Sequence, residues 1–206
     1  FFTFMVGCQD LDVDNPNNPA SEDVLSDGAN LRSLGGSVIQ NWYLTNMGYY
    51  ETPAFMMGTA ADAATASWGN FGLRDMSWEP RNAWNNDPAY GNSAYTEDWY
   101  KGMYAILSQS NDVLKGMTTE GIEIGEDNAD REMVRAVTKL GQGVALGYIG
   151  LVFDKGFIVK EDDDLTEEFE LQPYDQVIDA ALASIDEAIE IANNNEFTIP
   201  EAWLNS

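Results

Sequence analysis

Apolar residues recur at intervals of three and four through much of the chain, the spacing that places them on one face of an α-helix. One such run covers residues 99–117, with Thr96 as its expected N-cap. A second covers roughly residues 130–153, and a third begins at Pro173, in the first-turn position that proline favours. The pattern predicts three long amphipathic helices in the second half of the chain.

The second predicted helix contains several small residues, which would let a neighbouring helix approach closely: Gly141, Gly143, Ala145 and Gly147. Antiparallel helices joined by loops are the building unit of helical-repeat proteins, although no strict sequence repeat is visible here. The sequence therefore favours an all-α fold.

The first half of the chain is predicted to be less regular. A helix is expected over residues 38–50, after glycine interruptions at Gly28 and Gly35-Gly36. One face of this helix would hold Ile39, Trp42, Tyr43, Asn46 and Tyr50. Residues 58–93 follow neither the helical nor the strand period, which predicts a long irregular region of the kind that often carries function. The acidic stretch 161–170 is expected to be a solvated loop.

Composition and charge exclude several classes of function. The chain has 10 Lys and Arg against 35 Asp and Glu, a formal net charge of −25, whereas nucleic-acid binding needs clustered basic residues. The absence of histidine excludes His-based triads and His metal sites, and a single cysteine excludes an internal disulfide. No glycine-rich loop joins a strand to a helix, which gives nucleotide binding no support. We expect no cofactor and no metal.

The N-terminal residues resemble the end of a secretory signal. Residues 1–7 are apolar and end in small side chains, as in a signal-peptide remnant, and the only cysteine, Cys8, follows them. Met5-Val6-Gly7-Cys8 is similar to a bacterial lipobox, which predicts lipidation of Cys8. Residues 8–20 would then form an acidic tether, and residues 21–206 a helical domain. The alternative is a buried N-terminal strand with an ordinary free cysteine.

Aromatic residues are concentrated in the irregular region and its surroundings. Twelve of the 15 Trp and Tyr residues fall between Trp42 and Tyr104, several of them beside amides. A pyranose stacks its C–H face on Trp or Tyr and pairs its hydroxyls with Asn, Asp and Arg, so this composition is typical of a sugar site. The alternative is that these rings pin a long loop onto the helices. The candidate ligand-binding residues are Trp68, Asn70, Arg74, Trp78, Trp84, Asn85, Asn86 and Tyr90.

Four segments together resemble the N-terminal part of the SusD/RagB-type nutrient-binding outer membrane lipoproteins. The first is the lipobox-like segment with the Asn-Pro-Asn-Asn-Pro that follows it. The others are Trp99-Tyr100-Lys101-Gly102-Met103-Tyr104 with Asn111-Asp112-Val113-Leu114, the segment from Ala145 to Gly156, and Pro173-Tyr174-Asp175-Gln176-Val177-Ile178 with Ile185-Asp186-Glu187-Ala188-Ile189. Their order and spacing cover nearly the whole chain, which we expect to be incomplete at its C-terminus.

The resemblance implies an all-α fold of tetratricopeptide-like helix pairs with long irregular loop insertions. It also implies a non-catalytic lipoprotein, acylated at Cys8, exposed on the cell outer membrane. Such a protein caps a TonB-dependent, SusC-like β-barrel transporter and delivers an oligosaccharide to it. The family provides no motif that identifies the ligand residues, so the candidates above rest on composition and position.

Two other functions stay open. A helical lipoprotein could be structural and self-assemble at the surface through an apolar patch. An acidic glycoside hydrolase would need two carboxylates facing each other across a cleft. Its candidates in the aromatic region are Asp62, Asp75, Glu79 and Asp87.

Overall fold

The computed structural model describes residues 24–48, 53–67, 72–80, 85, 87–118 and 120–204. The predicted signal-peptide remnant, Cys8 and the acidic tether lie outside these residues. Within them the fold is all-α, as the sequence predicts.

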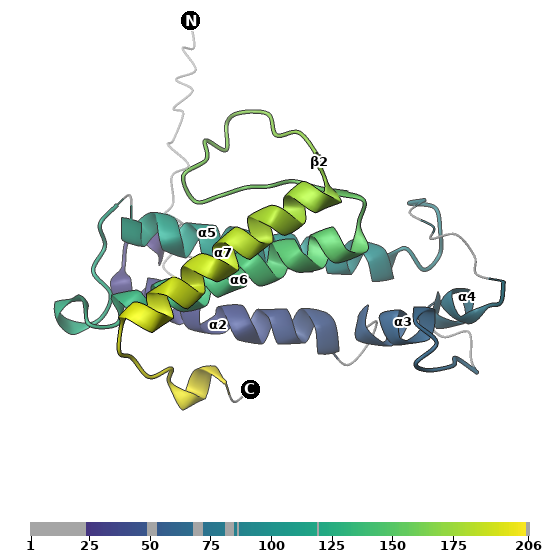
Figure 1. Ribbon diagram of the computed structural model, residues 1–206, viewed down its shortest axis with the longest axis horizontal. Helices are drawn as coiled ribbons and strands as arrows, with labels where there is room; N and C mark the ends of the chain where they lie inside the picture. Colours follow the sequence, from purple (N-terminus) through teal and green to yellow (C-terminus); the bar gives the residue numbers. More distant parts are fainter. Residues whose placement is uncertain are drawn as a thin grey trace, which may run out of the picture.

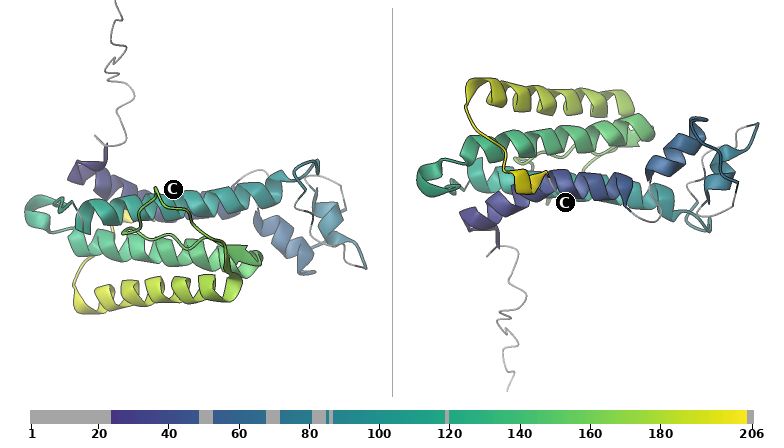
Figure 2. Two further views of the ribbon diagram at one scale, coloured as in Figure 1. Left: turned by 90° about the horizontal axis from the view of Figure 1, so that it is seen from above. Right: turned by 90° about the horizontal axis from the view of Figure 1, so that it is seen from below.

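Four long helices lie side by side and form an elongated body (Figure 1). They are α2 (Gly28–Met47), α5 (Ala94–Thr118), α6 (Arg131–Val152) and α7 (Tyr174–Asn194). Helix α6 lies in the middle, with α7 on one side of it and α2 and α5 on the other (Figure 2). Because consecutive long helices run in opposite directions, α6 and α7 are an antiparallel pair.

Short elements complete the body. Two-residue strands β1 (Lys155–Gly156) and β2 (Gln172–Pro173) pair antiparallel and close the base of the loop between α6 and α7. The 3₁₀ turns are η2 (Glu126–Asn128), before α6, and η3 (Glu201–Trp203), near the C-terminus. Helices α3 (Pro53–Ala60) and α4 (Leu73–Ser77) project at one end of the body, beside the start of α5 (Figure 1).

The predicted boundaries of the later helices are largely confirmed. Helix α6 has Asp130 as its N-cap and Phe153 as its C-cap, and Pro173 is the N-cap of α7. The prediction of Thr96 as the N-cap was wrong, because α5 begins two residues earlier. The Thr96 hydroxyl instead donates to the carbonyl of Ser93. The apolar periodicity predicts these helices well because each buries one face of its own against its neighbours.

Helix α2 differs most from the prediction, because it runs through Gly35 and Gly36 instead of starting after them. Both glycines are buried at helix contacts: a Cβ on Gly35 would lie 2.7 Å from the Val134 side chain, and one on Gly36 would overlap the indole of Trp203. Glycine is therefore present for close packing and does not break the helix. The predicted face is also partly wrong, since the Tyr43 side chain is half exposed.

The core forms two clusters along the body. The larger gathers apolar side chains from α2, α3, α5, α6 and α7, among them Met103, Leu146 and Ile149. The smaller, around Leu31 and Val134, is covered by the C-terminal segment that carries Trp203. Two of the small residues of α6 allow close contacts as predicted, since a Cβ on Gly141 would overlap the Val38 side chain of α2 and one on Gly143 would lie 2.8 Å from the Ala181 carbonyl oxygen of α7. Gly147 does not, because the atom nearest to a Cβ there is 3.8 Å away.

Candidate functional site

The described candidates for ligand binding lie at the projecting end of the molecule, which we call the aromatic lobe: α3, α4 with its C-cap residue Trp78, residue 85 and residues 87–93. Four of the eight candidates are described in the structure: Arg74, Trp78, Asn85 and Tyr90. The other four lie outside the described residues: Trp68, Asn70, Trp84 and Asn86. The region predicted to be irregular, residues 58–93, thus contains the end of α3 and all of α4, and α4 carries part of the candidate site.

Helix α4 places a cation over an exposed indole. Arg74 lies in its last turn and Trp78 is its C-cap residue, a spacing of four that puts both side chains on one side of the helix. The Arg74 guanidinium carbon lies 5.7 Å from the centroid of the Trp78 ring, within cation–π range. The Trp78 side chain remains 52% exposed, so much of the ring is accessible to a ligand.

A hydrogen-bonded chain adjoins this pair. The Tyr90 hydroxyl donates to the Asp75 carboxylate, and the Asn92 amide donates to the Tyr90 oxygen over 3.4 Å. Partial burial, reinforced by the hydrogen bond to Asp75, raises the pKa of Tyr90, so the phenol stays protonated as a donor. Gly72 allows the approach of these groups: its φ is +67°, and a Cβ there would lie 3.0 Å from the Asn92 Cβ.

Asn85 has a local structural role. Its side-chain oxygen accepts from the backbone N–H of Asp87 over 2.9 Å, and the Asp87 carboxylate accepts from the N–H of Ala89 over 2.9 Å. These bonds form consecutive side-chain-closed turns that shape the loop before Tyr90. The oxygen of Asn85 therefore stabilises the loop.

A surface hollow lies where the lobe meets the helical body. Its volume is about 310 Å³, and its lining includes Pro88 and Ser93 from the loop, Tyr100 of α5 and Phe153 at the end of α6. The Tyr100 and Phe153 rings pack edge to face, 5.0 Å between centroids. This end of the molecule therefore offers aromatic rings, on which the C–H face of a sugar can stack, beside polar loop atoms that can pair with the sugar hydroxyls.

The four carboxylates considered for glycoside hydrolysis are all exposed: Asp62, Asp75, Glu79 and Asp87. A glycosidase usually holds its acid in a partly desolvated pocket, and these exposed positions do not provide one. Asp75 is instead the acceptor for Tyr90. The arrangement gives the hydrolase no support. Among the described residues, no three potential ligand side chains cluster in a way that could hold a metal ion.

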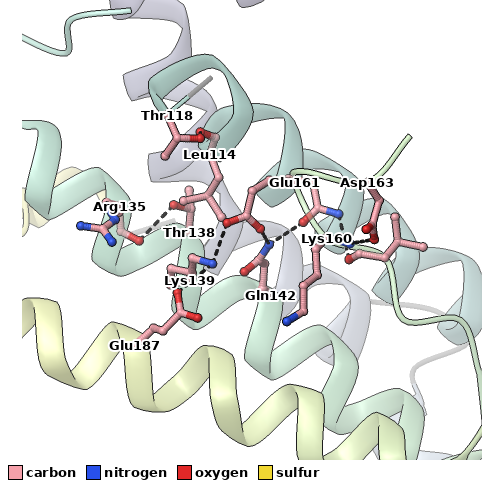
Figure 3. Close-up of polar contacts among 12 residues, drawn as sticks. Leu114, Thr118, Arg135, Thr138, Lys139, Gln142, Lys160, Glu161, Asp163 and Glu187 are labelled. Carbon is pink, nitrogen blue, oxygen red and sulfur yellow. Dashed lines mark hydrogen bonds and ion pairs between the residues drawn. The ribbon is translucent and has the colours of Figure 1, made fainter. Parts of the chain in front are cut away.

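A second polar cluster was not predicted from the sequence (Figure 3). Glu161 was expected in a solvated loop, but its side chain is only 10% exposed. The Lys139 ammonium on α6 lies 2.7 Å from the Glu161 carboxylate and 2.9 Å from that of Glu187 on α7. The Gln142 amide donates to both Glu161 and Asn111, over 2.7 and 2.5 Å. We call these five residues the buried polar network.

The network fixes the loop after β1 to the helices. Burial raises the pKa of Glu161, but hydrogen bonds from Lys139 and Gln142 outweigh it, so that the pKa is lowered overall. Burial likewise lowers the pKa of Lys139, and its two carboxylate partners reverse this and raise it. Asn111 adds a hydrogen bond to the Val159 carbonyl over 3.0 Å. The sequence signal that could have predicted this network is the pair of polar residues Lys139 and Gln142, one turn apart within a mostly apolar helix.

A cavity of about 270 Å³ adjoins the network, between α5 and residues 159–165. Its lining includes Leu107, Asp112, Lys115 and Leu165. Burial raises the pKa of the Asp112 carboxyl, with nearby Lys115 acting in the opposite direction. None of the four described ligand candidates lines this cavity.

Comparisons with protein-family models, with curated proteins and with solved structures give no match. The class is therefore defined by fold and site alone: an all-α protein whose body of long helices carries an aromatic lobe at one end. None of the helices in the described part of the chain is both long and apolar enough to cross a bilayer.

Proposed function

We propose that the protein is a non-catalytic surface lipoprotein that binds a glycan and delivers it to a TonB-dependent outer membrane transporter. The lipid at Cys8 would hold it at the outer membrane, and a SusC-like β-barrel would be its partner. This is the function that the SusD/RagB resemblance implies. The antiparallel pair α6–α7 supports the tetratricopeptide-like arrangement that the same resemblance implies.

One observation carries the glycan-binding part of the proposal. An exposed indole, Trp78, lies beneath the Arg74 guanidinium and near the hydrogen-bonded chain of Asp75, Tyr90 and Asn92. A monosaccharide unit could stack its C–H face on the indole, while its hydroxyls pair with the guanidinium, the carboxylate or the amide. The exposed positions of the carboxylates favour binding over hydrolysis.

The proposal can be tested by tryptophan fluorescence with a panel of neutral gluco-, xylo- and manno-oligosaccharides, together with peptides. One oligosaccharide is expected to give a saturable spectral change with no release of reducing ends. Trp78→Ala should weaken its binding by about tenfold, the equivalent of about 1.4 kcal/mol. Tyr174→Ala is the matched control, because Tyr174 is 57% exposed but belongs to α7, away from the lobe.

Three results would contradict the proposal: no spectral response to any member of the panel, unchanged affinity in Trp78→Ala, or turnover of the bound glycan. The transporter step needs a separate measurement. Mass spectrometry of the native protein in mild detergent should show an acylated Cys8 and a copurifying β-barrel, and an unacylated chain alone would argue against it.

A further inference from the structure

Helix α7 carries two apolar stripes, and only one of them is buried. The first faces α6 and consists of Val177, Ala181, Ser184, Ala188 and Ile191. The second is displaced by one residue and consists of Ile178, Leu182, Ile185 and Ile189. Leu182 and Ile189 are each 53% exposed. A helix that only needed to pack on α6 would require the first stripe alone.

Helix α6 extends this exposed face. Ile178 and Ile185 lie over Gly150 and Gly143, because a Cβ on Gly150 would be 2.9 Å from the Ile178 side chain and one on Gly143 would overlap that of Ile185. Leu151 follows Gly150 and is 75% exposed.

The other side of the α6–α7 contact carries the Lys139–Glu187 ion pair. Leu140 is also exposed. It lies about 100° around α6 from Lys139, on the side of the α6–α7 contact that carries the second stripe. We call Leu140 and Leu151 of α6 with the second stripe of α7 the apolar groove.

Acidic residues follow the outer edge of the apolar groove. Asp179 and Asp186 each come directly after an isoleucine of the second stripe, which places them about 100° further around α7. Both are exposed. Helix α7 contains no Lys or Arg. The edge is therefore negative along its length, and an occupant that brought acids to it would be repelled.

We infer that the apolar groove binds an amphipathic helix of a partner protein, with a Leu/Ile stripe flanked by Lys or Arg. The stripe from Ile178 to Ile189 extends about 17 Å at 1.5 Å per residue, so it would hold about three turns of the partner. Apolar side chains of the partner fill the groove at helical spacing, and its basic flank pairs with the acidic edge of α7.

Charge argues against the other occupants. A second copy of this chain would bring a further net charge of −25 and another acidic edge to the contact. An anionic membrane surface would be repelled by the same edge. The inference does not depend on glycan binding, because the groove lies on α6 and α7 whereas the candidate glycan site lies in the aromatic lobe.

The probe is a labelled synthetic helical peptide, slightly longer than the groove, with a leucine stripe flanked by lysines. Its control is the same peptide with glutamates in place of the lysines. Fluorescence anisotropy with the full chain should show binding of the lysine peptide that weakens as salt is raised, and no binding of the glutamate peptide.

Variants of the chain locate the binding face. Leu182→Asn with Ile189→Asn should weaken binding of the lysine peptide by about tenfold or more. Leu165→Asn with Leu204→Asn removes two apolar side chains that are at least as exposed but lie elsewhere, and should leave binding unchanged. Circular dichroism checks that each variant keeps its helices.

A double charge variant tests the acidic edge without touching the stripe. Asp179→Asn and Asp186→Asn together should weaken binding and flatten its salt dependence. The inference is wrong if both peptides bind equally, if the stripe variant binds like the wild type, or if sedimentation shows a dimer that the stripe variant dissociates. The last result would make a second copy the occupant.

Discussion

The buried polar network gives the sharpest quantitative prediction, because one cation serves two carboxylates of different exposure. Lys139→Met keeps most of the side-chain volume and removes the charge. Glu161, with its side chain 10% exposed, would then be left without its cationic partner in a largely desolvated position. Removing one partner of a buried pair typically costs about 3–5 kcal/mol of unfolding free energy.

The second carboxylate supplies the internal control. The Glu187 side chain is 47% exposed, so its ion pair with Lys139 is screened by water. Glu187→Gln should therefore cost only about 0–1 kcal/mol. Replacing both members of the buried pair, Lys139→Met with Glu161→Gln, leaves no buried charge uncompensated, because Glu187 is half exposed, and should cost less than Lys139→Met alone.

Urea denaturation followed by circular dichroism measures these four proteins and Glu161→Gln, which the test of additivity requires. The expected order of stability is wild type, then Glu187→Gln, then the double variant, with Lys139→Met lowest, and with similar denaturant slopes. A cost below about 1 kcal/mol for Lys139→Met, or strict additivity in the double variant, would refute the reasoning that Glu161 depends on Lys139 for its burial.

Three further predictions concern packing and pH. Gly143→Ala should destabilise the fold by about 1–3 kcal/mol because a Cβ there meets α7, whereas Gly147→Ala, whose nearest neighbour is at 3.8 Å, should be neutral or stabilising in thermal unfolding. Gly36→Ala should be destabilising alone but neutral or stabilising in a Trp203→Ala background, because the three atoms nearest the new methyl all belong to the Trp203 indole; equal costs in both backgrounds would contradict this. The pKa of Glu161 is lowered in the fold, so its stabilising contribution is complete above its unfolded pKa and is lost as pH falls through the folded value. Between about pH 5 and pH 3 the wild type should therefore lose more unfolding free energy than Glu161→Gln does.

The parts of the fold that the sequence predicts are those set by local periodicity. Helices α5, α6 and α7 each bury one face, and their apolar spacing reveals it directly. Helix α2 was not predicted in full, because the partners that make Gly35 and Gly36 necessary, Val134 and Trp203, come from distant segments. A glycine that breaks a helix and a glycine that permits close packing look the same until the neighbour is known.

The candidate sites, like the helices, could be predicted only in part from the sequence. Composition located the aromatic lobe, but it did not predict the short helix that places Arg74 over Trp78. Glu161 was assigned to a solvated run of acids because its neighbours in sequence are acids. Its partner, Lys139, lies 22 residues earlier on α6, and only the packed structure brings the two together.

The distribution of charge explains why the two sides of the α6–α7 contact differ. With 10 basic residues against 35 acidic ones, the chain has few cations for pairing its own carboxylates. On one side of the contact it commits Lys139 to Glu161 and Glu187, and the loop after β1 closes over them. On the other side α7 has no basic residue to balance Asp179 and Asp186, and the apolar groove beside them is open. Any molecule that covers this groove must therefore bring its own cations, which is why we expect the partner helix to be basic.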